Sequence, residues 1–160
     1  MTDSAPQTDA PPDSITREAW VSGRQLLDWL ERELENAFAP DPSKRFGGWF
    51  VRFSGMQVNF TIGNPAGKRV NSVTIGGQPL DETREYRVVA CEREGDPSDT
   101  LCRIEKVRRP VTLDKTTHQV LEEYLALHSP VSPVLEGRAI ATDQPATLLT
   151  QLQGTTYQFR

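Results

Sequence analysis

The stretch of residues 47–75 constrains the fold more than any other part of the chain. It reads GGWFVRFSGMQVNFTIGNPAGKRVNSVTI, and apolar and polar residues alternate through most of it. A two-residue period in β-branched and aromatic residues predicts β-strands whose alternate side chains face a core. Ser54-Gly55 and the sequence GNPAG at 63–67 interrupt the alternation. Such residues favour tight turns, so the stretch is predicted to form consecutive antiparallel strands.

Two segments show the four-residue period of an amphipathic helix. In the first, apolar residues recur after Ser22, the predicted N-cap, and Pro40 and Pro42 end the pattern. The predicted buried positions are Leu26, Leu30, Leu34 and Phe38, and the predicted outward positions are Glu31, Arg32, Glu33 and Glu35.

The second helix is predicted to begin at a cap provided by Asp114 or Thr116 and to end before Ser129-Pro130. Its apolar face is predicted to consist of Val120, Leu121, Tyr124, Leu125 and His128. His128 lies in the last turn, where an imidazole suits the helix dipole, so we expect no catalytic role for it. His118 is expected to be exposed.

The remaining strands are predicted at Ile15–Val21 (a short edge strand), Lys68–Ile75, Tyr86–Cys91 and Glu136–Thr142. The predicted fold is therefore α+β, a single domain with a mixed or antiparallel sheet of about five or six strands covered by two main helices. Residues 1–13 contain no Leu, Ile, Val or aromatic residue and are predicted to be disordered. The domain is predicted to span 14–143, followed by an extension, 144–160, whose end could add an edge strand.

Charge and composition exclude several classes of function. The net charge of −4 argues against nucleic-acid binding, which needs a basic surface. No apolar run approaches the ~18 residues of a membrane span, and the N-terminus lacks the basic-then-apolar pattern of an export signal. With two histidines and no Cys-x-x-Cys spacing, no metal site is predicted.

The chain shows no catalytic constellation. The segment GNPAGKR at 63–69 has the wrong glycine spacing for a phosphate loop, and Arg69 stands where such a loop needs Ser or Thr. Cys91 and Cys102 flank the polar loop EREGDPSDTL. They either form one disulfide in an oxidising compartment or remain two reduced thiols.

The order of these features resembles the C-terminal domain of the 5′-nucleotidase and UDP-sugar hydrolase family. Three pieces carry the resemblance: WVSGRQLLDWLE, then FSGMQVNFTIGNPAGKRVNSVTIGGQPLDETREYRVVAC, then HSPVSPVLEGRAIA. Together they extend over residues 15–142. The strand-plus-glycine start, the V-x-x-G-G-x-P-L-D turn and the S-P-V…E-G-R ending are the most specific of these motifs.

The resemblance implies a two-domain parent protein. In the family, an N-terminal metallophosphatase domain holds two divalent metals and the catalytic His-Asp pair, and the C-terminal domain binds the substrate by stacking its base between aromatic rings. The Asp-x-His and Asn-His-Glu motifs of the first domain are absent from this sequence. The resemblance thus implies that this chain contains no cofactor site and does not hydrolyse phosphate esters alone. It also implies a periplasmic or extracellular location.

The family pattern places candidate substrate-binding residues on two segments. Phe53 occupies the position of the first stacking aromatic, and Gly55 stands where some members have a base-contacting Asn. Arg93 stands near the second aromatic, and Gly95 and Asp96 keep the end of a Gly-Gly-Asp-Gly-type turn. An Arg over Phe53 could sandwich a planar group. The alternation with Val51 instead favours Phe53 as an ordinary core residue.

Two functions follow from this reading. In the first, the chain recognises a nucleoside, a nucleotide or a related small molecule for an N-terminal metallophosphatase domain. In the second, it is a structural or protein-interaction module that has lost nucleoside binding. Thiosulfate-processing relatives share the two-domain plan, and this half of the protein does not separate them from nucleotidases.

Overall fold

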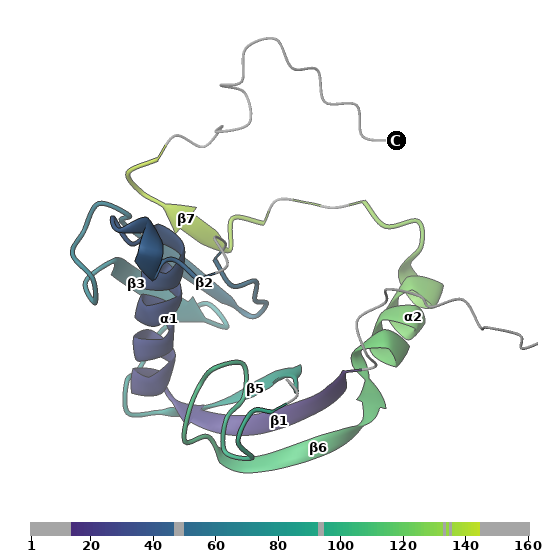
Figure 1. Cartoon of the computed structure of the whole chain (residues 1–160). Coiled ribbons are helices and arrows are strands. Elements are labelled where there is room, and N and C mark those ends of the chain that lie inside the picture. The colour runs from purple at the N-terminus through teal and green to yellow at the C-terminus, as the bar shows by residue number, and fades with distance from the viewer. Residues whose placement is uncertain (1–13, 47–49, 93–94, 133, 135, 145–160) are drawn as a thin grey trace, which may run out of the picture. The chain divides into compact units, whose positions relative to one another are not determined.

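A computed structural model describes residues 14–46, 50–92, 95–132, 134 and 136–144. The chain divides into two compact units (Figure 1). The first unit combines Met1–Ser22 with Arg84–Pro133, and the second combines Gly23–Thr83 with Val134–Arg160. The predictions for residues 1–13 and for the extension beyond Gln144 lie outside the described residues.

The first unit contains a three-stranded antiparallel sheet in the order β5-β1-β6 (Figure 1). The strands are β1 (Ile15–Ser22), β5 (Glu85–Cys91) and β6 (Arg108–Thr116). The prediction of an edge strand at Ile15–Val21 was wrong, because β1 pairs with both neighbours and lies at the centre of the sheet. Ala19 and Val21 on β1 have no exposed surface, as expected for a central strand.

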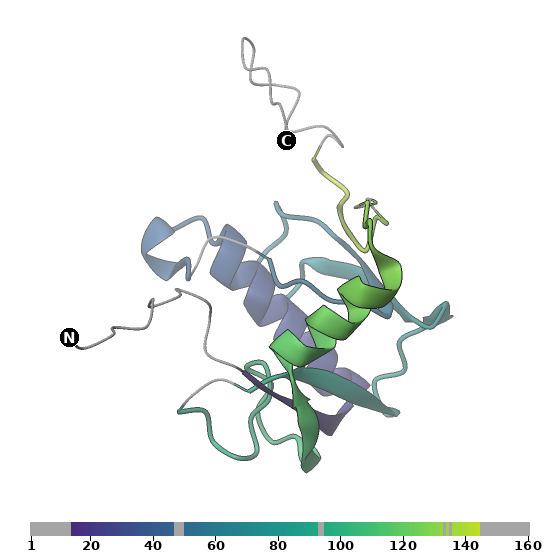
Figure 2. The same ribbon diagram turned by 90° about the vertical axis from the view of Figure 1, so that its right-hand side faces the viewer.

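Helix α2 (Thr117–His128) follows β6 directly (Figure 2). Thr116, one of the two predicted caps, accepts a hydrogen bond from the Gln119 N–H, and the Gln119 side chain accepts one from the Thr116 N–H. This reciprocal capping box satisfies two N–H groups that a helix start otherwise leaves unpaired. His128 stacks on Tyr124, with ring centroids 4.2 Å apart, and its Nδ1 lies 2.8 Å from the Tyr124 carbonyl oxygen.

The second unit contains helix α1 (Gly23–Phe38), a 3-10 turn η1 (Pro42–Lys44) and a four-stranded sheet in the order β4-β3-β2-β7 (Figure 1). The strands are β2 (Met56–Phe60), β3 (Val70–Ile75), β4 (Gln78–Pro79) and β7 (Ala139–Ala141). Strands β2 and β7 run parallel, and the other pairs are antiparallel. The Gly76-Gly77 turn has the positive φ angles (57° and 79°) that glycine adopts without strain.

Only part of the alternating stretch forms strands. The run from Val51 to Phe53 has no regular secondary structure and lies outside both sheets, and Gly55, with a φ of 81°, precedes β2. The backbone carbonyl of Phe53 accepts a hydrogen bond from the Arg138 side chain, so this part of the run is tied to a side chain and not to a strand. The prediction of a strand before Ser54 was therefore wrong.

Helix α1 buries the predicted apolar residues Leu26, Leu30 and Leu34, but the outward placement of its acidic residues was mostly wrong. Glu33 is only 2% exposed. The Glu31 carboxylate accepts hydrogen bonds from the backbone N–H groups of Arg69 (3.0 Å) and Val70 (2.7 Å). The Glu35 carboxylate pairs with the guanidinium of Arg69. Glu31 and Glu35 thus hold the start of β3 against α1, a role that the helical period does not reveal.

The predicted α+β class with two main helices is confirmed. The described strands are distributed over two sheets, of three and four strands. The two sheets share no strand: β1 pairs with β5 and β6, whereas β2 pairs with β3 and β7. Among the described residues, no helix is both long enough and apolar enough to cross a membrane.

Candidate functional site

Gly23, at the start of α1, lies against the end of the V-x-x-G-G-x-P-L-D segment. A Cβ atom added to Gly23 would lie 2.1 Å from the carbonyl oxygen of Asp81, well inside van der Waals contact. The Arg24 N–H donates to the Glu82 carbonyl at 2.9 Å. The Asp81 carboxylate in turn accepts from the N–H (2.8 Å) and hydroxyl (2.7 Å) of Thr83. Two of the motifs that carried the family resemblance therefore meet, and the close backbone approach explains why the position holds glycine.

Phe53 lies at the end of a row of aromatic rings. The Phe38 and Phe60 centroids are 5.9 Å apart, Phe60 and Phe50 are 5.3 Å apart, and Phe50 and Phe53 are 5.9 Å apart with their planes at 87°. Phe60 is 5% exposed, whereas Phe53 is half-buried. Phe53 thus contacts the aromatic row and keeps part of its surface exposed, and its role as a stacking residue remains a prediction.

A pocket of about 290 Å³ opens beside this ring. Its lining residues come from the extended segment before β2 and from the start of β7: Phe50, Val51, Arg52, Phe53, Arg138 and Ala139. The walls are mainly apolar, and two arginines are the polar contributors. This is the combination typical of small-molecule sites, in which apolar walls surround a few polar groups.

Arg138 connects β7 to this pocket. Its Nη1 donates to the Phe53 carbonyl oxygen at 2.6 Å, and its Nε lies 2.8 Å from Oε2 of Glu136. Its own carbonyl accepts from the Val58 N–H at 2.8 Å, at the beginning of the β2–β7 ladder. Arg138 was not among the site residues expected from the sequence. In the sequence, the only indication of this residue was the E-G-R motif at 136–138.

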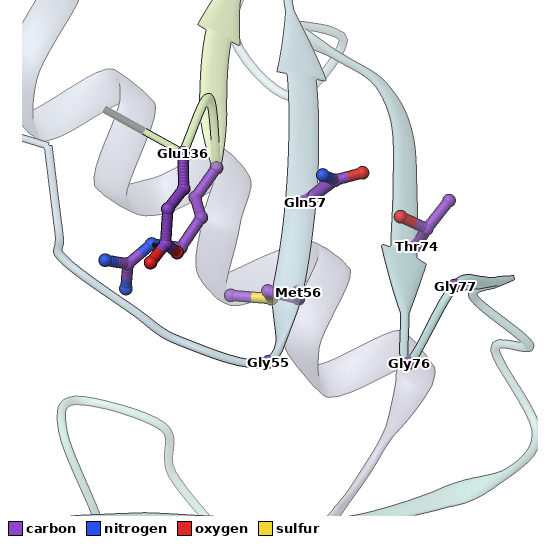
Figure 3. A pocket seen from close by; sticks show the side chains of 8 residues that line it. Gly55, Met56, Gln57, Thr74, Gly76, Gly77 and Glu136 are labelled. Atoms are coloured by element: carbon purple, nitrogen blue, oxygen red, sulfur yellow. Dashed lines mark ion pairs between the residues drawn. The ribbon is translucent and has the colours of Figure 1, made fainter. Parts of the chain in front are cut away.

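Gly55 lines a second hollow of about 280 Å³, together with the ends of β2 and β3 (Figure 3). In Figure 3, Met56 and Gln57 project from β2 and Thr74 projects from β3, and Glu136 lies on the other side of β2 from Thr74. Arg138 lines both hollows. Gly55 contributes no side chain to this hollow.

A polar network fastens the end of β7 to the loop that follows β2. Asp143 accepts hydrogen bonds from the backbone N–H groups of Ile62 (3.0 Å) and Gly63 (2.8 Å). These bonds favour the ionised carboxylate, and they lower the pKa of Asp143 from its usual value. Thr61 and Thr142 share a hydroxyl hydrogen bond of 2.8 Å, and Asn71 donates to both hydroxyls.

The segment GNPAGKR has a structural role in this arrangement. The N–H of Gly63 is taken by Asp143, and Arg69, only 2% exposed, points into the protein. The Arg69 Nε donates to the Ile62 carbonyl at 3.1 Å, and its Nη1 pairs with Glu35. Both groups are therefore bound to partners within the protein.

The other predicted binding residues belong to the first unit. Gly95 has a φ of 85°, and Asp96 is half-buried. Arg93 lies outside the described residues. Phe53 and Gly55 lie together in the second unit, and Gly95 and Asp96 lie together in the first. The groove that all of these residues were expected to form remains a prediction.

The Cys91–Cys102 bridge also remains a prediction. The side chain of Cys91 lies outside what the structure describes, and Cys102 is half-buried with a φ of 51°. Within residues 14–46, 50–92, 95–132, 134 and 136–144, no group of three or more His, Cys, Asp or Glu side chains is arranged to hold a metal ion.

Comparison with known proteins identifies the domain. Residues 18–92 match the family model described as 5′-nucleotidase, C-terminal domain. The match covers slightly less than half of the chain, and over this range the chain resembles that domain. The matched range contains Gly23, Phe53 and the first two of the three sequence motifs, and the resemblance expected from these motifs is confirmed.

Two curated relatives show the same similarity. A 5′-nucleotidase of Diplobatis ommata is 27% identical over 116 residues, which cover 66% of this chain and 20% of that protein. A protein named 5NUC from Lutzomyia longipalpis is 28% identical over 117 residues, which cover 68% of this chain and 20% of that protein. The chain therefore spans about a fifth of the length of these relatives.

Solved structures share the fold. The sulfate thiohydrolase SoxB of Thermus thermophilus superposes with a TM-score of 0.64 at 24% identity, over 82% of this chain and 23% of its own. A 5′-nucleotidase precursor, also from Thermus thermophilus, gives a TM-score of 0.59 at 23% identity, over 83% of this chain and 26% of its own. One fold thus serves enzymes named for two different substrates, so the fold alone does not identify the ligand.

Proposed function

We propose that this chain is the substrate-recognition domain of a 5′-nucleotidase-like metallophosphoesterase. The family match, and the small share that the chain takes of its longer relatives, support this proposal. Catalysis then belongs to an N-terminal metallophosphatase domain that holds two divalent metals. The residues of the present chain select and orient the substrate, and hydrolysis takes place at the metals.

The observation that supports substrate recognition best is the pocket beside Phe53. The half-buried ring offers a face on which a planar base can stack, a contact worth about 1–3 kcal/mol for nucleic-acid bases on aromatic side chains. The hydrogen bond from Arg138 fixes the backbone that carries this ring. Arg52, exposed on the same wall, offers a positive charge for a phosphate or ribose oxygen.

Gly55 limits the specificity of such a site. A base stacked on Phe53 would receive no side-chain hydrogen bond from Gly55, so discrimination between purines and pyrimidines would depend on the remaining walls. Arg93, Gly95 and Asp96 remain the predicted binding residues of the loop that follows β5. We therefore expect weak, base-tolerant binding by this chain.

Titration with adenosine, uridine and their monophosphates tests the proposal. Calorimetry gives the affinities, and amide chemical-shift changes identify the residues involved. We expect the largest shifts around Phe53 and Ala139 and a loss of binding in Phe53→Ala. Phe46→Ala, which removes a ring 62% exposed in the same unit but away from this pocket, is the matched control. Absence of heat and of shifts at millimolar ligand would reject nucleotide recognition.

A second function is favoured by the surface of α2. The apolar residues predicted to line one face of this helix are considerably exposed: Val120 46%, Leu121 52%, Tyr124 51% and Leu125 36%. An exposed apolar helix face is typical of a docking surface. In this alternative the chain is a non-enzymatic interaction module that has lost nucleoside binding. Capture of a matching metallophosphatase domain by the wild type, but not by Leu121→Glu, would support it, and equal capture by both would reject it.

A further inference from the structure

We propose that Arg17 is a positioning residue that holds the loop carrying Gly95 and Asp96. This inference rests on the proposed function, because Gly95 and Asp96 are predicted substrate-binding residues. Arg17 lies on β1, more than seventy residues before the loop in sequence, and none of the family motifs points to it.

The Arg17 side chain is buried and reaches the loop at two points. Arg17 is 6% exposed. Its Nη2 donates to the backbone carbonyl of Ser98 at 2.6 Å, and its Nη1 lies 3.4 Å from Oε1 of Glu92. The guanidinium therefore binds positions on both sides of Gly95 and Asp96. A planar fork with several fixed donors suits this double contact, which a lysine cannot reproduce with one ammonium group.

Burial makes these contacts obligatory for Arg17. A charged group removed from water is costly unless it is paired and hydrogen-bonded. Within a strand, alternate residues share a face, so Arg17 lies on the same face as Ala19 and Val21, which have no exposed surface. Displacing the loop would leave a buried cation without its carbonyl and carboxylate partners.

The two halves of the loop are anchored differently. The second half contains the nearly buried residues Leu101 (2% exposed), Ile104 (1%) and Val107 (5%), which provide hydrophobic anchoring. None of the described residues between Gly95 and Thr100 is buried. The backbone bonds there are local, such as Thr100 N–H to the Pro97 carbonyl (2.9 Å) and Val107 N–H to the Asp99 carbonyl (2.9 Å). Arg17 is the buried side chain that connects this first half to the sheet.

Native-state hydrogen exchange of Arg17→Met and Arg17→Lys tests the inference. In Arg17→Met we expect at least tenfold faster exchange at the amides of Thr100 and Val107, with unchanged exchange at the β1–β5 ladder amides. Arg17→Lys is expected to fall between this variant and the wild type. The control is Arg87→Met on the neighbouring strand β5, where an exposed Arg lies 3.5 Å from Glu18. It should leave loop exchange within twofold of the wild type.

The same variants are titrated with adenosine and uridine monophosphates, which separates the two proposals. Faster loop exchange together with at least fivefold weaker binding supports both. If Arg17→Met shows faster loop exchange but the wild type binds no nucleotide, the proposed function is rejected and the positioning role of Arg17 is supported. Loop exchange within twofold of the wild type in Arg17→Met overturns the inference. Uniformly faster exchange throughout the sheet in both Arg17 variants also overturns it, because Arg17 would then only stabilise the fold.

Discussion

Replacing Arg69 by Met is expected to destabilise the second unit strongly, although the segment containing Arg69 looks like a surface loop in the sequence. Arg69 is 2% exposed, and its guanidinium binds the Glu35 carboxylate and the Ile62 carbonyl. Met keeps much of the aliphatic volume of Arg and removes every donor. The substitution therefore tests the polar contacts with little change in packing.

The expected loss follows from the partners left behind. Removing one member of a fully buried ion pair costs about 3–5 kcal/mol, because the other charge remains buried and unpaired. Glu35 is 31% exposed in its side chain, so water compensates part of this cost. We expect a loss of about 3 kcal/mol, which corresponds to a fall in melting temperature of roughly 6–12 °C for a chain of this size.

Urea unfolding followed by circular dichroism measures this loss. Arg24→Met is the matched control, because Arg24 lies on α1 in the same unit and also pairs with carboxylates, those of Asp28 and Glu82. Its side chain is 62% exposed, and exposed ion pairs contribute about 0–1 kcal/mol. In a double-mutant cycle with Glu35→Gln, we expect a coupling energy of about 1–3 kcal/mol.

A loss below about 1 kcal/mol for Arg69→Met, or a loss equal to that of Arg24→Met, would refute this reasoning. Either result would mean that the Arg69 side chain is solvated in solution and that the α1–β3 contact does not depend on it. A coupling energy near zero would leave Arg69 important but would reject Glu35 as its partner.

Three further predictions concern single positions. Gly23→Ala should cost about 2 kcal/mol or more in urea unfolding, because its methyl group would overlap the backbone of Asp81; stability equal to the wild type would show that α1 and Asp81 separate easily. The lowered pKa of Asp143 means that its stabilising contribution is present above its unfolded pKa of about 3.9 and is lost as pH falls through the lowered folded value. Asp143→Asn should therefore be less stable than the wild type at pH 7, and the difference should shrink at pH 3; a constant difference would contradict this assignment. Thr116→Ala should lower stability by about 1 kcal/mol through loss of the cap of α2, measured by thermal unfolding, and Thr117→Ala serves as the neighbouring control.

Much of the local structure followed from the order of residues alone. The leucine period of α1, the Thr116 cap of α2 and the Gly76-Gly77 turn agree with the structure, because each depends on contacts within a few residues. The motif order also predicted the family. The strand before Ser54 was predicted wrongly, because a two-residue alternation indicates only that one side of the chain is exposed and the other is covered. An irregular segment that packs on a row of aromatic rings also has these two sides.

The candidate site was only half accessible to sequence reasoning. Phe53 and Gly55 were identified through the family pattern, and the structure places them on neighbouring hollows that share Arg138. Arg138 and Arg17 escaped notice because each acts on a residue about eighty positions away, on the Phe53 and Ser98 carbonyls. A backbone carbonyl has the same chemistry in every residue, so no side-chain pattern records such a contact.

The sequence by itself determined both helices and most of the strands of this protein, its α+β class and its resemblance to the 5′-nucleotidase C-terminal domain. Those properties are encoded in short-range periodicity, turn residues and motif order. Only the tertiary structure decided which charged residues are buried and which strands share a sheet. Arg17, Glu33 and Arg69 look like surface residues in the sequence, yet each is at most 6% exposed. Burial of a charge depends on partners that folding brings together, and those partners are distant along the chain.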